Sequence, residues 1–207
     1  MIIYPFSPNP ELFHRLQFLY VSGMANASSV HWAGQISKKF LANARKQIAQ
    51  YFQVNTNTVF FTSSWHEYFR IIISGWTEYQ KKSGIDNSET IIITRKNLPS
   101  KVIDIFHSRN PFLSVRFISL DSHIASNLPF LEQLKQYQSK YTLVLITLMN
   151  DDTVIYKKKD LEKIITFCHE NQYLLWLDVT DSLYHYHSSF IELSPYFDFI
   201  TFNHTGA

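Results

Sequence analysis

The run Thr142-Leu143-Val144-Leu145-Ile146-Thr147-Leu148 decides the fold, because it is apolar almost throughout and does not alternate polar with apolar residues. A strand of this kind must be covered on both faces, which is typical of parallel sheets. Further along, Lys159 to Glu170 has the apolar spacing of a helix, and Leu174 to Leu177 is a second apolar strand that ends at Asp178. Strand, helix and strand in this order predict a parallel βαβ unit.

The same alternation extends along the rest of the chain. Helices are predicted over Gln35 to Phe52, from Trp65 to Tyr79, over Lys101 to His107 and over Leu128 to Gln138, and strands over Thr58 to Thr62, Thr90 to Thr94, Val115 to Ser119 and Phe197 to Phe202. The fold class is therefore α/β, a mainly parallel sheet with helices on both faces. Residues 1–34, with Pro5, Pro8 and Pro10, are expected to form an extended segment that packs on one large domain, residues 35–207.

The composition excludes several classes of protein. With 45% hydrophobic residues the chain can bury a large core, and 19 Lys and Arg against 17 Asp and Glu leave no basic field for nucleic acid. One cysteine, Cys168, excludes a disulfide framework and a multi-cysteine metal site, and fits a cytoplasmic protein. No apolar run reaches the roughly 18–20 residues that span a bilayer, so no membrane insertion is expected. Five glycines are too few for glycine-rich phosphate loops.

Ligands bind parallel sheets beyond the carboxyl ends of the strands, so polar residues that follow strands are the candidates. Ser63 to His66 begins a helix, where backbone N–H groups suit a phosphate, but spacing alone favours the alternative that Ser63 or Ser64 only caps the helix. Asp178 could hold a negative charge against a protonated ring nitrogen or a metal, or it could cap the following turn. The residues by themselves leave these alternatives open.

Three other features favour ordinary structural roles. His185 and His187 could bind a metal, but no acidic or cysteine partner has a convincing spacing, so surface or interface histidines are favoured and no metal site is expected. Cys168 lies in a helical pattern among apolar residues, which favours a buried small hydrophobe over a nucleophile. The lysines at 157–159 favour a solvated helix start over nucleic-acid contact.

Several segments, in the same order and spacing, resemble the class V aminotransferase superfamily and, within it, the cysteine desulfurases. The first is Asn26-Ala27-Ser28-Ser29-Val30-His31-Trp32-Ala33-Gly34, which is similar to the family's N-P-S-S-x-H-x-x-G. Phe61-Thr62-Ser63-Ser64-Trp65-His66-Glu67 resembles the phosphate turn F-T-S-G-x-T-E. Met149-Asn150-Asp151-Asp152 is similar to V-N-N-E, and Leu177-Asp178-Val179-Thr180-Asp181-Ser182 resembles V-D-x-x-Q-S.

The resemblance implies the large domain of the pyridoxal-phosphate fold-type I enzymes, with pyridoxal phosphate as cofactor. Ser64, Trp65 and His66 would then cradle the phosphate, Asp178 would face the pyridine nitrogen, and Asn150 would lie near the phenolic oxygen. Relatives of this kind form dimers with the cofactor at the subunit boundary, so the resemblance also implies a homodimer or another partner protein.

The departures from the family pattern determine the expected function. Ser64 and Trp65 replace glycines of the phosphate turn, Pro99 replaces a stacking histidine, and Asp181 replaces a glutamine at the phenolic oxygen. Asn203-His204-Thr205-Gly206 stands where the family has S-x-H-K, whose lysine forms the Schiff base with the cofactor. Asn203 and His204 are thus expected beside the cofactor, although this segment lacks the amine that the family's lysine provides.

We therefore expect no catalytic residue in this chain, since the lysine is replaced and the small domain that carries the desulfurases' attacking cysteine is expected to be absent after Ala207. The prediction is a catalytically degenerate desulfurase-like protein that acts through ligand or partner binding. The alternative is a pyridoxal-phosphate-dependent desulfurase or aminotransferase that another chain completes.

Overall fold

The computed structural model describes residues 10–21, 25–84, 90–94, 116–119, 130–137, 141–147, 156–179 and 191–202. The chain divides into two compact units, and the boundary between them falls between Phe60 and Phe61. The first unit is helical and the second contains the sheet.

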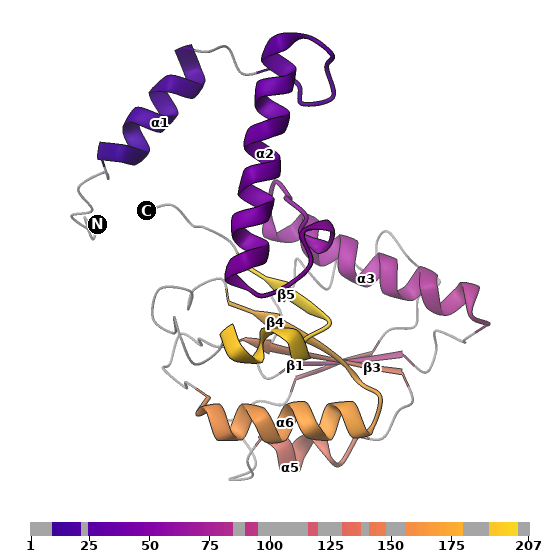
Figure 1. Ribbon diagram of the computed structural model, residues 1–207. Helices are drawn as coiled ribbons and strands as arrows, with labels where there is room; N and C mark the ends of the chain where they lie inside the picture. The colour runs from indigo at the N-terminus through magenta and orange to yellow at the C-terminus, as the bar shows by residue number, and fades with distance from the viewer. Residues whose placement is uncertain are drawn as a thin grey trace, which may run out of the picture. The chain divides into compact units, whose positions relative to one another are not determined.

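In the first unit α1 spans Pro10–Val21, α2 spans Trp32–Tyr51 and the short 3₁₀-helix η1 spans Thr56–Thr58 (Figure 1). Helix α2 confirms the helix predicted over 35–52, although it begins three residues earlier. Helix α1 shows that the extended conformation predicted for residues 1–34 was wrong over 10–21. Pro10 is compatible with this helix because the first helical residue needs no N–H bond. The packing of residues 1–34 on a large domain stays a prediction.

The strand predicted over Thr58 to Thr62 was also wrong, because Thr58 ends η1 and residues 59–62 have no regular structure. Asn55 accounts for the difference. Its side-chain oxygen accepts a hydrogen bond from the N–H of Asn57 at 2.9 Å, and the hydroxyl of Thr58 donates to its carbonyl at 2.7 Å. These local bonds give the backbone a tight turn in place of a strand ladder.

In the described part of the second unit, five strands form one sheet, all parallel, in the order β2-β1-β3-β4-β5. Their bounds are Thr90–Thr94 for β1, Arg116–Ser119 for β2, Tyr141–Thr147 for β3, Leu174–Asp178 for β4 and Phe199–Thr201 for β5. Each lies within a residue or two of a predicted strand, so the prediction of a parallel sheet is confirmed.

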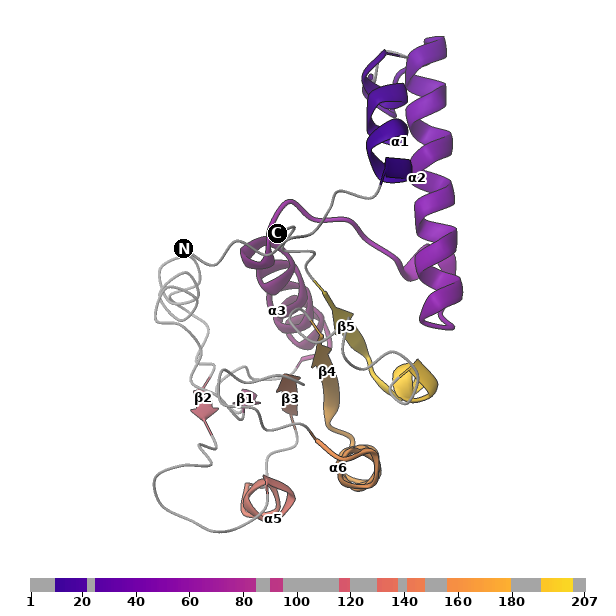
Figure 2. The same cartoon turned by 90° about the vertical axis from the view of Figure 1, so that its left-hand side faces the viewer.

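Helices cover both faces of this sheet, as predicted. Helix α3 lies on one face, and α5 and α6 lie on the other (Figures 1 and 2). The bounds are Trp65–Lys82 for α3, Phe130–Leu134 for α5, Lys158–Glu170 for α6 and Ile191–Tyr196 for the 3₁₀-helix η3. The helix predicted over Lys101 to His107 lies outside the described residues.

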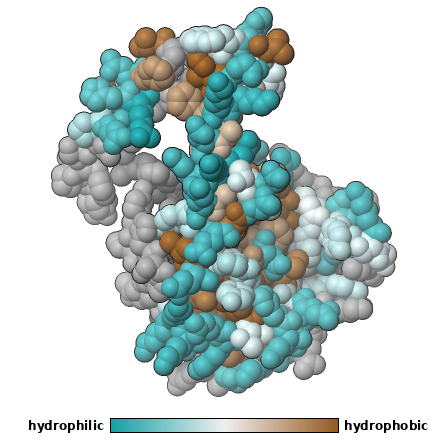
Figure 3. All heavy atoms as spheres, in the orientation of Figure 1, coloured by the Kyte–Doolittle hydropathy of each residue, from teal (hydrophilic) through white to brown (hydrophobic). Residues whose placement is uncertain are grey.

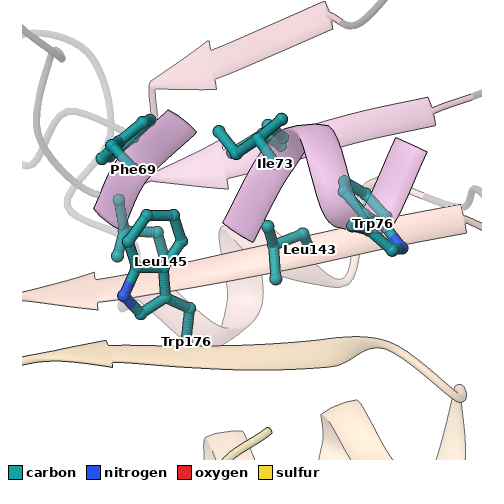
Figure 4. Close-up of a cluster of buried hydrophobic side chains, with 7 residues drawn as sticks. Phe69, Ile73, Trp76, Leu143, Leu145 and Trp176 are labelled. Atoms are coloured by element: carbon teal, nitrogen blue, oxygen red, sulfur yellow. The ribbon is translucent and has the colours of Figure 1, made fainter. Parts of the chain in front are cut away.

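The core between α3 and the sheet follows from the two periodicities of the sequence. Phe69, Ile73 and Trp76 recur on one side of α3, and alternate residues of the strands, Leu143 with Leu145 on β3 and Trp176 on β4, point to the same face (Figure 4). Because Trp176 is completely buried, this face of the sheet is dry at its centre.

The opposite face of the sheet packs against α6. The helix buries Leu161, Ile164, Ile165 and Cys168, while its outward side is hydrophilic (Figure 3). Cys168 is completely inaccessible to solvent. The preference for a buried hydrophobe at this position is therefore confirmed.

Gly34 on α2 is surrounded by the turn that precedes the helix. Asn26 closes this turn, since its carbonyl accepts from the N–H of Ser29 and its side chain accepts from the N–H of Ser28, both at 2.9 Å. A Cβ added at Gly34 would lie 2.7 Å from the carbonyl oxygen of Asn26 and 2.7 Å from the Cβ of Ser29. The turn therefore requires glycine at this position.

Replacing Gly34 with alanine is expected to lower the free energy of unfolding by about 1–3 kcal/mol, the usual cost of forcing atoms into a packed site. Gly75 on α3 provides the matched control, because a Cβ there meets nothing within 4 Å. Gly75→Ala should raise the free energy of unfolding by about 0.5–1 kcal/mol through helix propensity. Urea titrations followed by circular dichroism measure both changes, and an equal loss in the two variants would contradict the assignment.

The thiol of Cys168 is expected to resist alkylation in the folded chain. Burial, together with the nearby charge of Asp198, raises its pKa to about 12. At pH ~8 only about one such thiol in ten thousand would be ionised. Iodoacetamide should label the denatured chain readily and the native chain only as fast as it unfolds, as mass spectrometry would show. Rapid labelling without unfolding would mean that Cys168 is accessible.

Candidate functional site

Polar residues end the strands at the carboxyl edge of the sheet. Thr147 at the end of β3 is paired in register with Asp178 at the end of β4, which is paired with Thr201 at the end of β5. Since side chains two residues apart share a face, these three lie on the face of Leu145, Trp176 and Phe199, which is the face that α3 covers. A row of hydroxyl, carboxylate and hydroxyl groups therefore lies where ligands of parallel sheets bind.

Helix α3 directs its N-terminus toward this edge. The ring of Phe69, near the start of α3, lies 4.7 Å from the ring of Trp176, and Tyr68 meets the same indole edge-on at 6.2 Å. Trp76 lies at the other end of the cluster, beyond Leu143, so α3 runs antiparallel to the strands (Figure 4).

At the usual rise per residue of a helix and of a strand, the start of α3 and the end of β4 both lie about 7 Å from the contact between Phe69 and Trp176, in the direction of this edge. Ser64 and His66 are thus at the same edge of the sheet as Asp178. Ser63 to His66 follows a loop and not the strand that was predicted before it.

The start of α3 is closed by two reciprocal caps. The hydroxyl of Ser64 accepts a hydrogen bond from the N–H of Glu67 at 3.3 Å. The carboxylate of Glu67 in turn accepts from the N–H and the hydroxyl of Ser63, at 2.6 and 2.7 Å. The return bond goes to Ser63, one residue before the N-cap, so the arrangement is a variant of the capping box, and it contains the cap that spacing favoured for Ser64.

The capping box places a fixed negative charge at the start of α3. The bonds from the backbone N–H and then the hydroxyl of Ser63 hold the pKa of Glu67 below its ordinary value, and Arg70 acts in the same direction. An anion that binds this terminus must therefore use N–H groups other than those of Ser63 and Glu67. The first turn also contains the backbone N–H groups of Trp65 and His66.

Asp178 is half-buried and ends β4 between two hydroxyl-bearing residues. The dry core beneath it, with Trp176 two residues earlier on the same face, keeps solvent to one side of the carboxylate. A carboxylate in such a position can accept a hydrogen bond from a cationic group of a ligand, such as a protonated ring nitrogen.

Four predicted site residues lie outside the described residues: Asn150, Asp181, Asn203 and His204. Pro99, His185 and His187 also lie outside them, and only the backbone of Trp65 is described. Their roles, and those of Ser64, His66 and Asp178 toward a cofactor, stay predictions.

Within the described part of the chain, no cluster of three or more His, Cys, Asp or Glu residues could hold a metal ion. No helix in that part is long and apolar enough to cross a membrane.

Sequence reasoning missed two features of this edge. The partnership of Ser64 with Glu67 could have been read from the spacing S-x-x-E before an apolar run. The bond from the indole N–H of Trp176 to the hydroxyl of Thr201, 2.9 Å long and buried, joins residues 25 positions apart. No local pattern could have indicated it.

Loss of the Glu67 charge is expected to explain part of the acid sensitivity of the fold. Because the pKa of Glu67 is lowered by folding, its stabilising effect is complete above the ordinary value of 4.5 and is lost as the pH falls through the lowered pKa. In Glu67→Gln the stability should therefore change less between neutral pH and about pH 3 than in the wild-type chain. Glu78→Gln, on an exposed part of the same helix, is the control in urea titrations. Identical pH profiles for wild type and Glu67→Gln would contradict this role.

The architecture is shared with solved structures of low sequence identity. A NifS-like protein from Rickettsia africae ESF-5 superimposes with a TM-score of 0.66 at 19% identity, over 94% of this chain and 50% of that one. A cysteine desulfurase from Thermococcus onnurineus NA1 gives 0.69 at 16% identity, over 94% and 46%. DndA from Streptomyces lividans gives 0.68 at 18% identity, over 97% and 54%. The chain thus spans about half the length of these structures.

No curated protein matches the chain. The family model of class-V aminotransferases, however, matches residues 8–203, which is nearly the whole sequence. Together with the parallel sheet and the polar edge described above, this match shows that the chain belongs to the class-V aminotransferase family.

Proposed function

We propose that this chain is a catalytically degenerate, cysteine desulfurase-like protein that binds a phosphate-bearing pyridine ligand without a covalent bond. One observation carries the proposal: the first turn of α3 and Asp178 lie at one edge of the sheet, while Gly206 stands where the family has its lysine. The site thus retains two of the groups that hold such a ligand and lacks the amine that would react with it.

The described residues fit the two ends of pyridoxal phosphate, the cofactor that this family normally uses. The N–H groups of Trp65 and His66 suit the phosphate, and the carboxylate of Asp178 suits a protonated ring nitrogen. When bound, this cofactor supplies an electron sink for reactions at the α-carbon of amino acids. In this chain Asp178 would hold the ring proton, and the core around Trp176 would exclude water from below.

The residues do not fit covalent catalysis. Thr205 and Gly206 offer no primary amine, and Asp181 would repel a phenolate oxygen in place of donating a hydrogen bond to it. We therefore propose that the protein works through binding, as a cytoplasmic homodimer or with another partner protein. The exposed Trp32 of the first unit, 71% accessible, supports a protein contact.

A titration with pyridoxal phosphate tests this proposal. The wild-type chain should bind the cofactor reversibly in equilibrium dialysis, and reduction with borohydride should leave no stoichiometric adduct detectable by mass spectrometry. Asp178→Asn should weaken binding by about tenfold, as expected for loss of a charged hydrogen bond. Gly206→Lys, which restores the amine, should yield one reducible adduct per chain. Failure of the wild-type chain to bind would contradict the proposal.

A second candidate is an active pyridoxal-phosphate enzyme that another chain completes. The features in its favour are the retained Asp178 and Asn150 and the outline of the phosphate turn at 61–67. A stoichiometric adduct on a wild-type lysine after borohydride reduction would favour this candidate over the first.

A further inference from the structure

We infer that Trp176 and Thr201 are positioning residues that hold Asp178 in place for the ring of the ligand. The inference rests on the proposed function, because it concerns the same site. Neither residue was a candidate from the sequence, and both are buried, with 0% and 7% of their surfaces accessible.

Hydrogen bonds bracket Asp178 on both sides. Two residues before it, the indole N–H of Trp176 donates to the hydroxyl oxygen of Thr201 at 2.9 Å. One residue after it, the N–H of Val179 donates to the carbonyl oxygen of the same Thr201 at 2.8 Å. Thr201 is also the register partner of Asp178 on the neighbouring strand. The end of β4 is therefore fastened to a single residue of β5 from both sides of the carboxylate.

These two hydrogen bonds to Thr201, called the bracket below, oppose the fraying of the strand ends. Asp178 is the last residue of β4 and Thr201 is the last of β5, so the two bonds to Thr201 fix the separation of the strands where their regular pairing ends. An indole N–H left without a partner in this dry core would incur the full cost of its desolvation. The two ends are thus kept together, and the carboxylate keeps one position relative to the start of α3.

A carboxylate held in one position distinguishes ligands by the ring atom that lies opposite it. Pyridoxal phosphate with a protonated ring nitrogen can donate a hydrogen bond to Asp178, whereas the analogue with a C–H group at that position cannot. Phosphate contacts at α3 would be equal for the two ligands. Loss of the bracket should therefore lower the preference for the ligand with the ring nitrogen and leave the affinity for the analogue with the C–H group unchanged.

The experiment compares the affinities of both ligands for the wild-type chain and four variants. Thr201→Val removes the acceptor with little change in shape and should lower the affinity for pyridoxal phosphate about three- to tenfold, the equivalent of one hydrogen bond. Thr201→Ser keeps the hydroxyl and should retain the wild-type preference. Trp176→Phe keeps an aromatic ring but lacks the N–H, and should reproduce the loss if Thr201→Val does not fold.

Thr77→Val is the matched control, because Thr77 is also buried and its hydroxyl donates to the carbonyls of Ile73 and Ser74 within α3. It should retain the full preference for the ring nitrogen. If Thr201→Val keeps the wild-type preference, or if Thr201→Ser also loses it, the inference is overturned while the proposed function stands. If the wild-type chain binds neither ligand, the proposed function fails, and the inference fails with it.

Discussion

The contact between Trp176 and the first turns of α3 determines where the candidate site lies. Truncation of a buried tryptophan typically costs about 3–5 kcal/mol, whereas loss of a helix cap costs about 1 kcal/mol. Packing against the indole, and not the capping box, therefore sets the direction of α3 across the sheet. Because Phe69 and Tyr68 meet Trp176 close to the end of β4, the N-terminus of α3 reaches the edge that carries Asp178.

The charges at this edge favour a ligand with a cationic ring over a simple anion. Helix α3 contributes about half a positive charge at its N-terminus, which the carboxylate of Glu67 already offsets. Asp178 adds a second carboxylate at the same edge of the sheet. A phosphate alone would gain little from such a site, whereas a ligand that joins a phosphate to a protonated ring can satisfy both ends. Under the proposed function, a site of this kind without a covalent bond is expected to have only modest affinity for its ligand.

Much of the fold could be predicted from the sequence because burial leaves a periodic signature. The apolar runs of β3 and β4 and the spacing of Phe69, Ile73 and Trp76 indicated a parallel sheet between helices, and both are present. The errors at 10–21 and 58–62 occurred where local hydrogen bonds or a tolerated first-turn proline outweighed propensity. The cap formed by Ser64 could have been predicted from the spacing S-x-x-E. The bond between Trp176 and Thr201 could not have been predicted, since it depends on the register of β4 and β5.

The three solved structures share this fold at 16–19% identity, so the fold does not depend on most individual side chains. Core positions such as Leu143 and Leu145 need only apolar side chains of suitable size, so many substitutions preserve the sheet and the edge where its strands end. A lysine that bonds a cofactor has no such tolerance, because no other side chain supplies a primary amine. Under the proposed function, position 206 decides the covalent chemistry, whereas the parallel sheet, the direction of α3 and the position of Asp178 depend on the core. Under that proposal, fold and covalent chemistry would be separable, because the fold depends on many interchangeable contacts and the covalent bond depends on one amine.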